Sequence, residues 1–352
     1  DNNCTITRMQ VPGEGPTFYG SRCDRYDAAA GHARQRTAFD DREELLFANS
    51  EGGGGNGPTV GIPRALLVYD FAPLLIAFVN ALGARPLLTS RSTGDIIARS
   101  TELAYTDSCF PVKILHGHAA ALDHADYILY PSAIRLGRME GPENQKYACP
   151  LVQASPYIIR QSVELGERLI VPTLDFSQGD EDVIENLTAA AVKMGYSKEL
   201  GRTAAMAGLK ALEEFRARQA ETGKRVLAEL QQSGKLGVVI FARAYMGQDS
   251  GANLGIAEKL AQLGVAPIPL DYLPLETVNP KEYQDRPYWA YESKFIAAAR
   301  LVSENPQLYG LALTNFGCGP NSFMLRMVHD IMGGKPMGQL EIDEHAAEAG
   351  IV

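Results

Sequence analysis

The sequence predicts an α/β protein with two open parallel-sheet domains, a helical segment between them and a small cysteine-bearing segment in front. Short apolar runs alternate with helical patterns in both halves of the chain, its centre reads as continuous helix, and a glycine-rich stretch follows the first residues. Strands that alternate with helices of about 10–15 residues are typical of βαβ units and a parallel sheet. We therefore divide the chain into residues 1–57, 58–180, 181–234 and 235–352.

The first 57 residues differ in character from the rest. They hold Cys4 and Cys23, a β-like stretch around "CTITRMQV" and many polar residues, and they end in "EGGGGNGP" at 51–58. Such a glycine-rich run reads as a flexible linker. Because the chain starts without Met, we expect it to be a piece of a longer polypeptide.

Residues 58–180 alternate between short apolar runs and helical patterns. Strands are expected at 59–63, 85–90, 126–132 and 168–176, and helices at 65–83, 93–103, 111–124 and 154–165. Thr93 or Asp95 fits the start of the second helix, since both residue types cap helices well. The apolar run 65–83 contains Asp70 and reads as a buried helix, not as a membrane span.

Residues from about 180 to 233 are rich in Ala, Leu, Glu, Lys and Arg, all good helix formers. The alternation then resumes. Strands are expected at 235–243, 266–272, 309–316 and 337–343, and helices at 252–264, 288–305 and 322–333. In open α/β sheets, ligands bind beyond the carboxyl ends of the strands, so two such sheets that face each other predict a cleft.

Composition narrows the classes of function. Of 352 residues, 45% are hydrophobic and 21% charged, the profile of a soluble globular protein. The net charge of −9 and the absence of a Lys/Arg-rich run argue against a nucleic-acid partner. No apolar run is long enough to predict a membrane span, and no signal peptide is recognised. Five cysteines are too few and odd in number for a secreted disulfide scaffold, so we expect a reducing cytoplasm.

Three cysteines precede a proline by one or two residues: Cys109 in "CFP", Cys149 in "CP" and Cys318 in "CGP". Proline is favoured in the first turn of a helix, so each cysteine should lie at a helix N-terminus. The helix dipole and free N–H groups at that place stabilise a thiolate and lower the pKa of the thiol. Cys318 also follows the strand expected at 309–316. Because thiolates bind metals, the three cysteines together predict a metal site.

Other interpretations of these cysteines are open. A free cysteine is commonly a small buried hydrophobic residue. Zinc is the rival metal, although zinc sites usually take ligands in close pairs such as C-x₂-C, and the gaps here are 40 and 169 residues (149 − 109 and 318 − 149). Cys4 and Cys23 lack the proline and are expected to complete a zinc or iron site with residues outside this chain.

The residues around these cysteines carry a family resemblance. "VGIPRALLVYDFAPLLIAFVNALG", "SCFPVKILHGH", "KYACPLV", "FARAYMGQDSGANLG" and "NFGCGPNSFMLR" resemble the domain appended to large CoA-substrate-specific enzyme activases, which are related to the 2-hydroxyglutaryl-CoA dehydratase activator. That domain is similar to 2-hydroxyacyl-CoA dehydratase and benzoyl-CoA reductase subunits and to double-cubane cluster proteins. The resemblance covers residues 58–352. "NCTITR" and "GSRCDRY" resemble the cysteine-bearing linker that precedes the domain.

The resemblance implies two Rossmann-like domains with a [4Fe–4S] cluster held by Cys109, Cys149 and Cys318. A double-cubane cluster would need more thiolates than these three. An ATP-dependent activase domain or subunit is implied as partner and electron donor, CoA or acyl-CoA as ligand, and a homodimer is compatible with it. The chain has neither a G-x-x-x-x-G-K-[ST] phosphate loop nor an activase-type ATPase motif, so nucleotide hydrolysis should lie outside this piece.

Three further groups are candidate site residues. Lys113 and His116 share a helix face and could donate hydrogen bonds to a cluster or an anion, or could simply line the core or the surface. Gly251, Asn253 and Gly255 lie in a loop between strand and helix that could hold a phosphate or ribose of CoA, or be an ordinary turn. Glu341 lies two residues before Asp343 on a strand, where it could act as an acid or base or end the strand at the surface.

These observations lead to one main hypothesis and two alternatives. The first is an iron–sulfur redox domain of a dehydratase- or activase-type system that takes part in ATP-coupled electron transfer at low potential and is not an independent hydrolase. The second is a cluster-free module that binds CoA or another anionic small molecule. The third is a structural scaffold with Cys4 and Cys23 in a zinc site.

Overall fold

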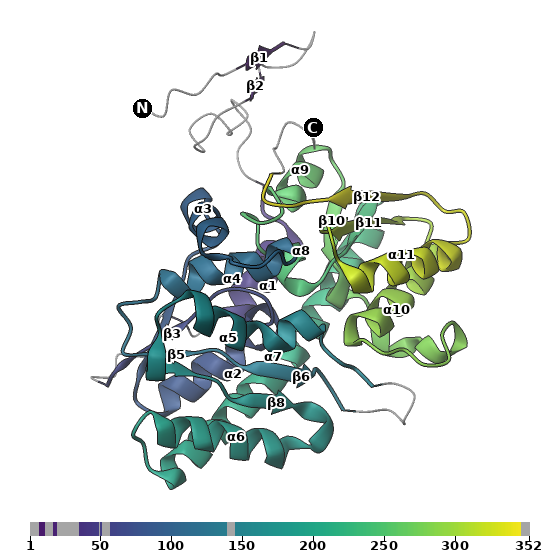
Figure 1. Cartoon of the computed structure of the whole chain (residues 1–352). Helices are drawn as coiled ribbons and strands as arrows, with labels where there is room; N and C mark the ends of the chain where they lie inside the picture. Colours follow the sequence, from purple (N-terminus) through teal and green to yellow (C-terminus); the bar gives the residue numbers. More distant parts are fainter. Residues whose placement is uncertain are drawn as a thin grey trace.

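The computed structural model describes residues 7–10, 17–19, 35–48, 50, 57–138 and 145–345. Two α/β lobes are each built on a four-stranded parallel sheet, as the alternation predicted, and helices cover the sheets (Figure 1). The first sheet has the strand order β4-β3-β5-β7 and the second β10-β9-β11-β12. Strands that are far apart in the sequence are neighbours in these sheets, so their ends bring distant segments of the chain to the boundary between the lobes.

The first lobe follows the expected order with small shifts at the ends. Its sheet contains β3 (Thr59–Ile62), β4 (Arg85–Leu88), β5 (Tyr127–Leu129) and β7 (Leu169–Ile170), and its helices are α2 (Val68–Ala81), α3 (Gly94–Leu103), α4 (Phe110–Ala120), α5 (Pro150–Ser162) and the 3₁₀ turn η1 (Gly166–Arg168). Thr93 caps α3, as expected, by accepting a hydrogen bond from the backbone N–H of Ile96.

Two expected strands are each divided. The strand expected at 126–132 forms β5 and then β6 (Ser132–Arg135), and the one expected at 168–176 forms β7 and then β8 (Thr173–Asp175) and η2 (Phe176–Gln178). Pro131 and Pro172 lie at the two breaks, and proline has no N–H to give to a ladder. Strands β6 and β8 pair in a separate two-stranded sheet.

Two helices, α6 (Asp180–Lys193) and the 36-residue α7 (Lys198–Ser233), confirm the expected helical segment. Ser197 caps α7 through a hydrogen bond from Leu200 N–H, and Gly234 ends it in the left-handed conformation. At Gly208, α7 approaches α2 so closely that an added Cβ would lie 2.8 Å from the carbonyl oxygen of Leu74.

The second lobe also follows the expected order. Its sheet contains β9 (Gly237–Phe241), β10 (Ala266–Pro269), β11 (Leu308–Thr314) and β12 (Met337–Glu341). Its helices are α8 (Ala244–Gln248), α9 (Ile256–Gln262), α10 (Ala290–Glu304) and α11 (Gly319–Met332), with 3₁₀ turns η3 (Leu270–Tyr272), η4 (Leu275–Thr277) and η5 (Pro280–Glu282). Helix α11 starts three residues before the expected position, directly after Cys318.

One helix in the N-terminal segment was not expected. Helix α1 (Ala38–Leu46) buries Phe39, Arg42 and Leu46, and so belongs to the packed body of the protein. Arg42 forms a buried ion pair with Asp271 of the second lobe at 2.8 Å and donates to the carbonyl oxygen of Tyr69 in the first. Strands β1 (Thr7–Met9) and β2 (Thr17–Tyr19) form an antiparallel pair.

The two lobes share apolar packing. One cluster of buried side chains contains the core of the first lobe and also Ile240, Tyr245, Met246 and Leu313 of the second. A second cluster fills the space between the second sheet and helices α10 and α11. Because the first cluster crosses the boundary, a change in the angle between the lobes would expose apolar surface to water. Among the described helices, none is long and apolar enough to cross a membrane.

We expect Gly208→Val to destabilise the protein by about 1–3 kcal/mol, because the added atoms would press on the backbone of α2. Ala217→Val, at an exposed position of the same helix, should cost only about 0.5 kcal/mol, the ordinary difference in helix propensity. Urea unfolding measures both changes. Equal losses of stability would contradict close packing at Gly208.

Candidate functional site

The three proline-linked cysteines lie where the sequence pattern placed them in the local structure. Cys109, Cys149 and Cys318 are the N-cap residues of α4, α5 and α11, and each helix has proline in its first turn. All three are free thiols and partly buried. Cys318 also follows β11, at the carboxyl end of the second sheet.

The fold brings these three cysteines from two lobes into one crevice. The charges of Cys318 and Cys149 both act on the thiol of Cys109, and all three thiols act on Tyr245. Cys318 Sγ accepts a hydrogen bond from Arg243 Nη1 at 3.4 Å. A small cavity beside Cys149 is also lined by Arg243 and Tyr245. The ends of α4, α5, α8 and α11 thus meet at one place.

The expected lowering of the thiol pKa is wrong for Cys109. Burial raises the pKa of the Cys109 thiol to about 11, and the hydrogen bond from the backbone of Val112 does not compensate. Burial disfavours the charged form of any acid, so the low-dielectric crevice here outweighs the helix N-terminus. The free thiol is therefore neutral near pH 7.

Arg243, which the sequence analysis did not select, forms the inner wall of the crevice. The side chain is buried, and in the described part of the chain no carboxylate forms an ion pair with it. Its Nη1 donates to Asn321 Oδ1 at 2.7 Å as well as to Cys318 Sγ. Burial works against its charge, yet nearby Tyr245, Cys318 and Cys149 keep the pKa of Arg243 above its ordinary value. The only signal for it in the sequence is its place at the carboxyl end of the strand expected at 235–243.

Tyr245 is the second polar residue of this wall that the sequence analysis did not select. It lies two residues after Arg243, in the short helix α8, and is buried. Burial raises the pKa of its phenol well above 10, with further contributions from the three thiols. The phenol is therefore neutral and can donate a hydrogen bond.

The predicted residues Lys113, His116 and Glu341 have other contacts. Lys113 Nζ forms ion pairs with Glu344 at 2.5 Å and with Asp107 at 2.9 Å. His116 Nδ1 lies 3.0 Å from the carbonyl oxygen of Lys113 in its own helix, and burial lowers its pKa. Glu341 is the exposed last residue of β12. Catalytic roles for these three residues stay predictions.

The glycine-rich loop that was expected to hold CoA contacts the first lobe. A Cβ at Gly251 would overlap the carbonyl oxygen of Ser92. Asn253 is buried and donates to the carbonyl oxygens of Met246 and Gly247, while Gly255 adopts the left-handed conformation before α9. The close approach of Gly251 is to the chain itself, and binding of CoA by this loop stays a prediction.

A chain of hydrogen bonds crosses from the first lobe to the second near this loop. Thr89 Oγ1 accepts from the backbone N–H of Arg64, so its hydroxyl can donate to His118 Nδ1 at 2.6 Å. Ser92 Oγ donates to Asp249 Oδ2 at 2.6 Å, so it accepts from His118 Nε2, 3.0 Å away. The contact with Ser92 requires a proton on His118 Nε2, and burial, which lowers the pKa of His118 to about 4, keeps the ring neutral near pH 7.

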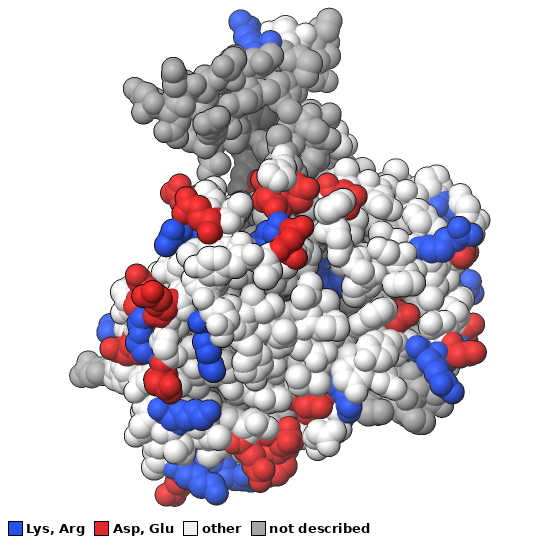
Figure 2. Space-filling model, in the orientation of Figure 1, with Lys and Arg blue, Asp and Glu red and all other residues white. Residues whose placement is uncertain are grey.

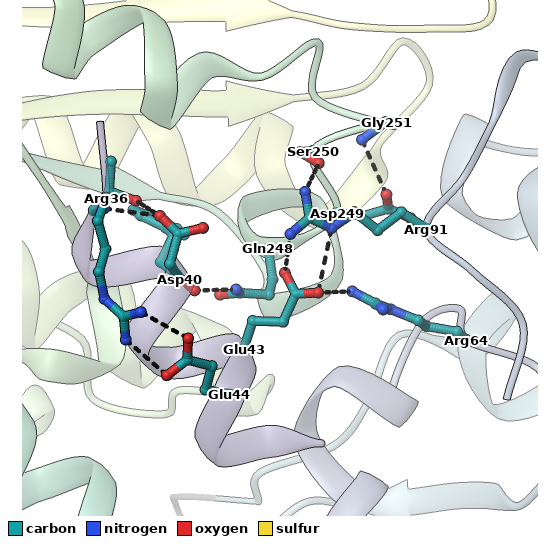
Figure 3. Close-up of polar contacts among 12 residues, drawn as sticks. Arg36, Asp40, Glu43, Glu44, Arg64, Arg91, Gln248, Asp249, Ser250 and Gly251 are labelled. Carbon is teal, nitrogen blue, oxygen red and sulfur yellow. Dashed lines mark hydrogen bonds and ion pairs between the residues drawn. The ribbon is translucent and has the colours of Figure 1, made fainter. Parts of the chain in front are cut away.

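Charged residues of α1 strengthen the same boundary (Figure 3). The Glu43 carboxylate pairs with Arg64 at 2.6 Å and with Arg91 at 2.9 Å, and Arg91 donates to Ser250 Oγ. Gln248 donates to the carbonyl oxygen of Phe39 at 2.6 Å. Helix α1 therefore binds both lobes at once.

Within the described residues, no group of three or more His, Cys, Asp and Glu side chains is arranged to hold a metal ion. Cys4 and Cys23, for which a zinc or iron site was expected, lie outside the described residues.

Comparison with sequence families gives a match over residues 59–273 to the family described as "CoA enzyme activase uncharacterised domain". The chain belongs to this family. The matched part of the activase domain contains Cys109, Cys149 and Arg243 but stops before Cys318. This family match confirms the suspected relation to CoA-substrate enzyme activases.

Two other comparisons give no further evidence about the function of the activase domain. A search of curated proteins found no match. The C-terminal domain of glucosamine-fructose-6-phosphate aminotransferase from Francisella tularensis is 11% identical with a TM-score of 0.21, over 86% of this chain and 80% of that chain. A likeness at this level supports no argument about fold or function.

The buried His118 should make stability fall in mild acid. Burial lowers its pKa from 6.5 to about 4. As pH falls from 6.5 to about 4, the unfolded chain takes up a proton that the folded activase domain does not, so stability is lost across this window, by about 3 kcal/mol in total.

Urea unfolding as a function of pH measures this loss. The variant His118→Asn should have a shallower slope than the parent protein, and His124→Asn, at an exposed position, should keep the parent slope. If the slope of His118→Asn equals that of the parent, the depressed pKa is not the cause of the loss.

Proposed function

We propose that the two lobes form a redox domain of an activase system, in which Cys109, Cys149 and Cys318 hold a [4Fe–4S] cluster. The observation that carries this proposal is a buried arginine beside three partly buried thiols. Arg243 has no carboxylate partner among the described residues, and a buried charge is costly unless an opposite charge lies close to it. Thiolates that ligate a cluster would supply that charge.

The residues present fit such a cluster. Three cysteines at helix N-termini surround one crevice, and the proposal does not require their sulfurs to meet at one ion, since irons and sulfides separate the ligands of a cubane. When bound, the cluster would supply one-electron transfer at low potential. Arg243 would donate its hydrogen bond to the Cys318 thiolate and neutralise part of the negative charge.

Three protein ligands would leave one iron without a protein thiolate. Tyr245 is the polar side chain of the inner wall that interacts with all three thiols, so its phenol could donate a hydrogen bond to whatever occupies that position. Asn321 accepts from Arg243 and donates to Thr314 Oγ1 at 2.8 Å, and so holds the guanidinium in place.

The surface around the crevice suits a protein partner. Figure 2 shows few charged residues over α4, α5 and α11. Apolar side chains close to the cysteines in sequence are exposed: Tyr105, Leu151, Phe316 and Phe323. We propose that an ATP-dependent activase domain or subunit contacts this face and delivers electrons to a CoA or acyl-CoA acceptor in the cytoplasm.

Anaerobic reconstitution with iron and sulfide tests the cluster. We expect broad brown absorption and about four irons per chain, as the cubane class requires. Cys149→Ser should abolish this absorption. The double variant Cys4→Ser with Cys23→Ser is the control, and it should keep the absorption. Normal cluster loading in Cys149→Ser would overturn the assignment.

Replacement of Arg243 tests the charge argument. Arg243→Met should weaken cluster retention by about 10–100-fold and make the reduction potential more negative, because the cluster loses its buried positive neighbour. Arg243→Lys keeps the charge and should lie between the Met variant and the parent. Anaerobic chelator competition and a redox titration followed by EPR measure the two effects. If Arg243→Met retained the cluster as well as the parent does and at the same reduction potential, a group other than Arg243 would balance the negative charge of the cluster.

A further inference from the structure

A large cleft opens on another side of the boundary between the lobes. Its walls are α7 on one side and α10 on the other, and residues 271–280 border it. The cavity volume is about 790 Å³, which lies within the range of about 300–1,000 Å³ typical of small-molecule sites. The dimensions alone suit an organic ligand.

Two cations on α7 face this cleft without partners. Arg216 and Lys224 both line it, and in the described part of the chain neither forms a hydrogen bond or an ion pair. Arg216 is accessible from the cleft, yet the surrounding protein lowers its pKa by desolvation. Its guanidinium lies 5.7 Å from the ring centre of Phe176, which leaves its N–H groups free to donate.

The carboxylates of the cleft are mostly neutralised. Asp271 pairs with Arg42, and Asp70 accepts from the Tyr291 hydroxyl at 2.9 Å and lies 3.9 Å from Lys294 Nζ. Glu276 is exposed on the bordering loop. The unpaired charges on the α7 wall are therefore positive and favour an anion.

The rest of the lining is largely apolar. It includes Phe215 and Leu227 from α7 and Leu273, Leu275 and Val278 from the bordering loop. Apolar surface beside unpaired cations suits a ligand that has both an anionic group and a hydrocarbon chain.

We propose that this cleft binds an amphiphilic anion, with a carboxylate or phosphate held by Arg216 and Lys224 and an apolar chain packed against Leu227, Leu273 and Leu275. The cleft lies close to the cysteine crevice, because Leu136 lines both the cleft and the small cavity beside Cys149. A bound chain that extends to Leu136 is one side chain away from the proposed redox centre. The binding site itself stands on its own lining and does not depend on the cluster.

Binding to the full chain without cluster tests the proposal. Octanoate, octyl phosphate and octanoyl-CoA are the probes, with octanol as a neutral control, in calorimetric titration and thermal unfolding. We expect at least one anionic probe to bind and stabilise the protein and octanol to have no comparable effect. Binding of octanoate would identify a free carboxylate as sufficient, whereas binding of octanoyl-CoA alone would identify a phosphorylated thioester.

Matched charge variants locate the site. Arg216→Ala with Lys224→Ala should weaken binding by about tenfold or more, since both charge-assisted contacts are lost. Lys210→Ala with Arg218→Ala removes the same charge from α7 outside the cleft and should bind like the parent. Because Arg216 and Lys224 form no hydrogen bond or ion pair with another described residue, and the Arg216 guanidinium lies as far as 5.7 Å from the Phe176 ring centre, their removal should change thermal stability without ligand only slightly. Equal weakening in both double variants, or no binding of any anion to the parent, would overturn the proposal, and neither result would bear on cluster assembly.

Discussion

The apolar core that the two lobes share is the constraint on which the candidate site depends. Ile240 and Leu313, near the ends of β9 and β11, pack in the same cluster as the first lobe, and Tyr245 and Met246 of α8 join them. Two of the three cysteines come from the first lobe and one from the second, so a rotation between the lobes would change the distances from Cys318 to the other two thiols. Burial of the shared surface opposes that rotation, and the bond from Ser92 to Asp249 fixes the register across the boundary.

Burial in the crevice disfavours both the thiolate of Cys109 and the charge of Arg243, but it neutralises only the thiol. It raises the pKa of Cys109 and so keeps the free thiol neutral, whereas Arg243 stays charged because arginine is not deprotonated in proteins. The free protein therefore holds a buried positive charge that the neutral Cys109 thiol does not balance. An anionic occupant removes this imbalance, and helix N-termini at all three cysteines favour the same sign of charge.

Patterns that act within a few residues predicted most helices and strands. Contacts between distant parts of the chain determined the features that the sequence analysis missed or left ambiguous. Proline after each cysteine correctly predicted three helix N-termini, because the effect of proline acts within one turn. Helix α1 was not predicted, since its buried Arg42 finds its charged partner in Asp271, more than two hundred residues away. The signal of Gly251 was ambiguous for a physical reason: a glycine that allows close approach looks the same whether a phosphate or the backbone of Ser92 approaches it.

Tyr291 connects the cleft and the crevice physically. Its hydroxyl donates to Asp70 of the first lobe and accepts from the N–H of Ala244, next to Arg243. Its ring lies 4.7 Å from Lys294 Nζ on the cleft side and 6.0 Å from the Arg243 guanidinium on the crevice side. An anion in the cleft would attract Lys294 away from Asp70 and from this ring. The resulting change in field and packing would reach Arg243 through a single aromatic side chain, so we expect occupancy of the cleft to affect the electrostatics of the thiols.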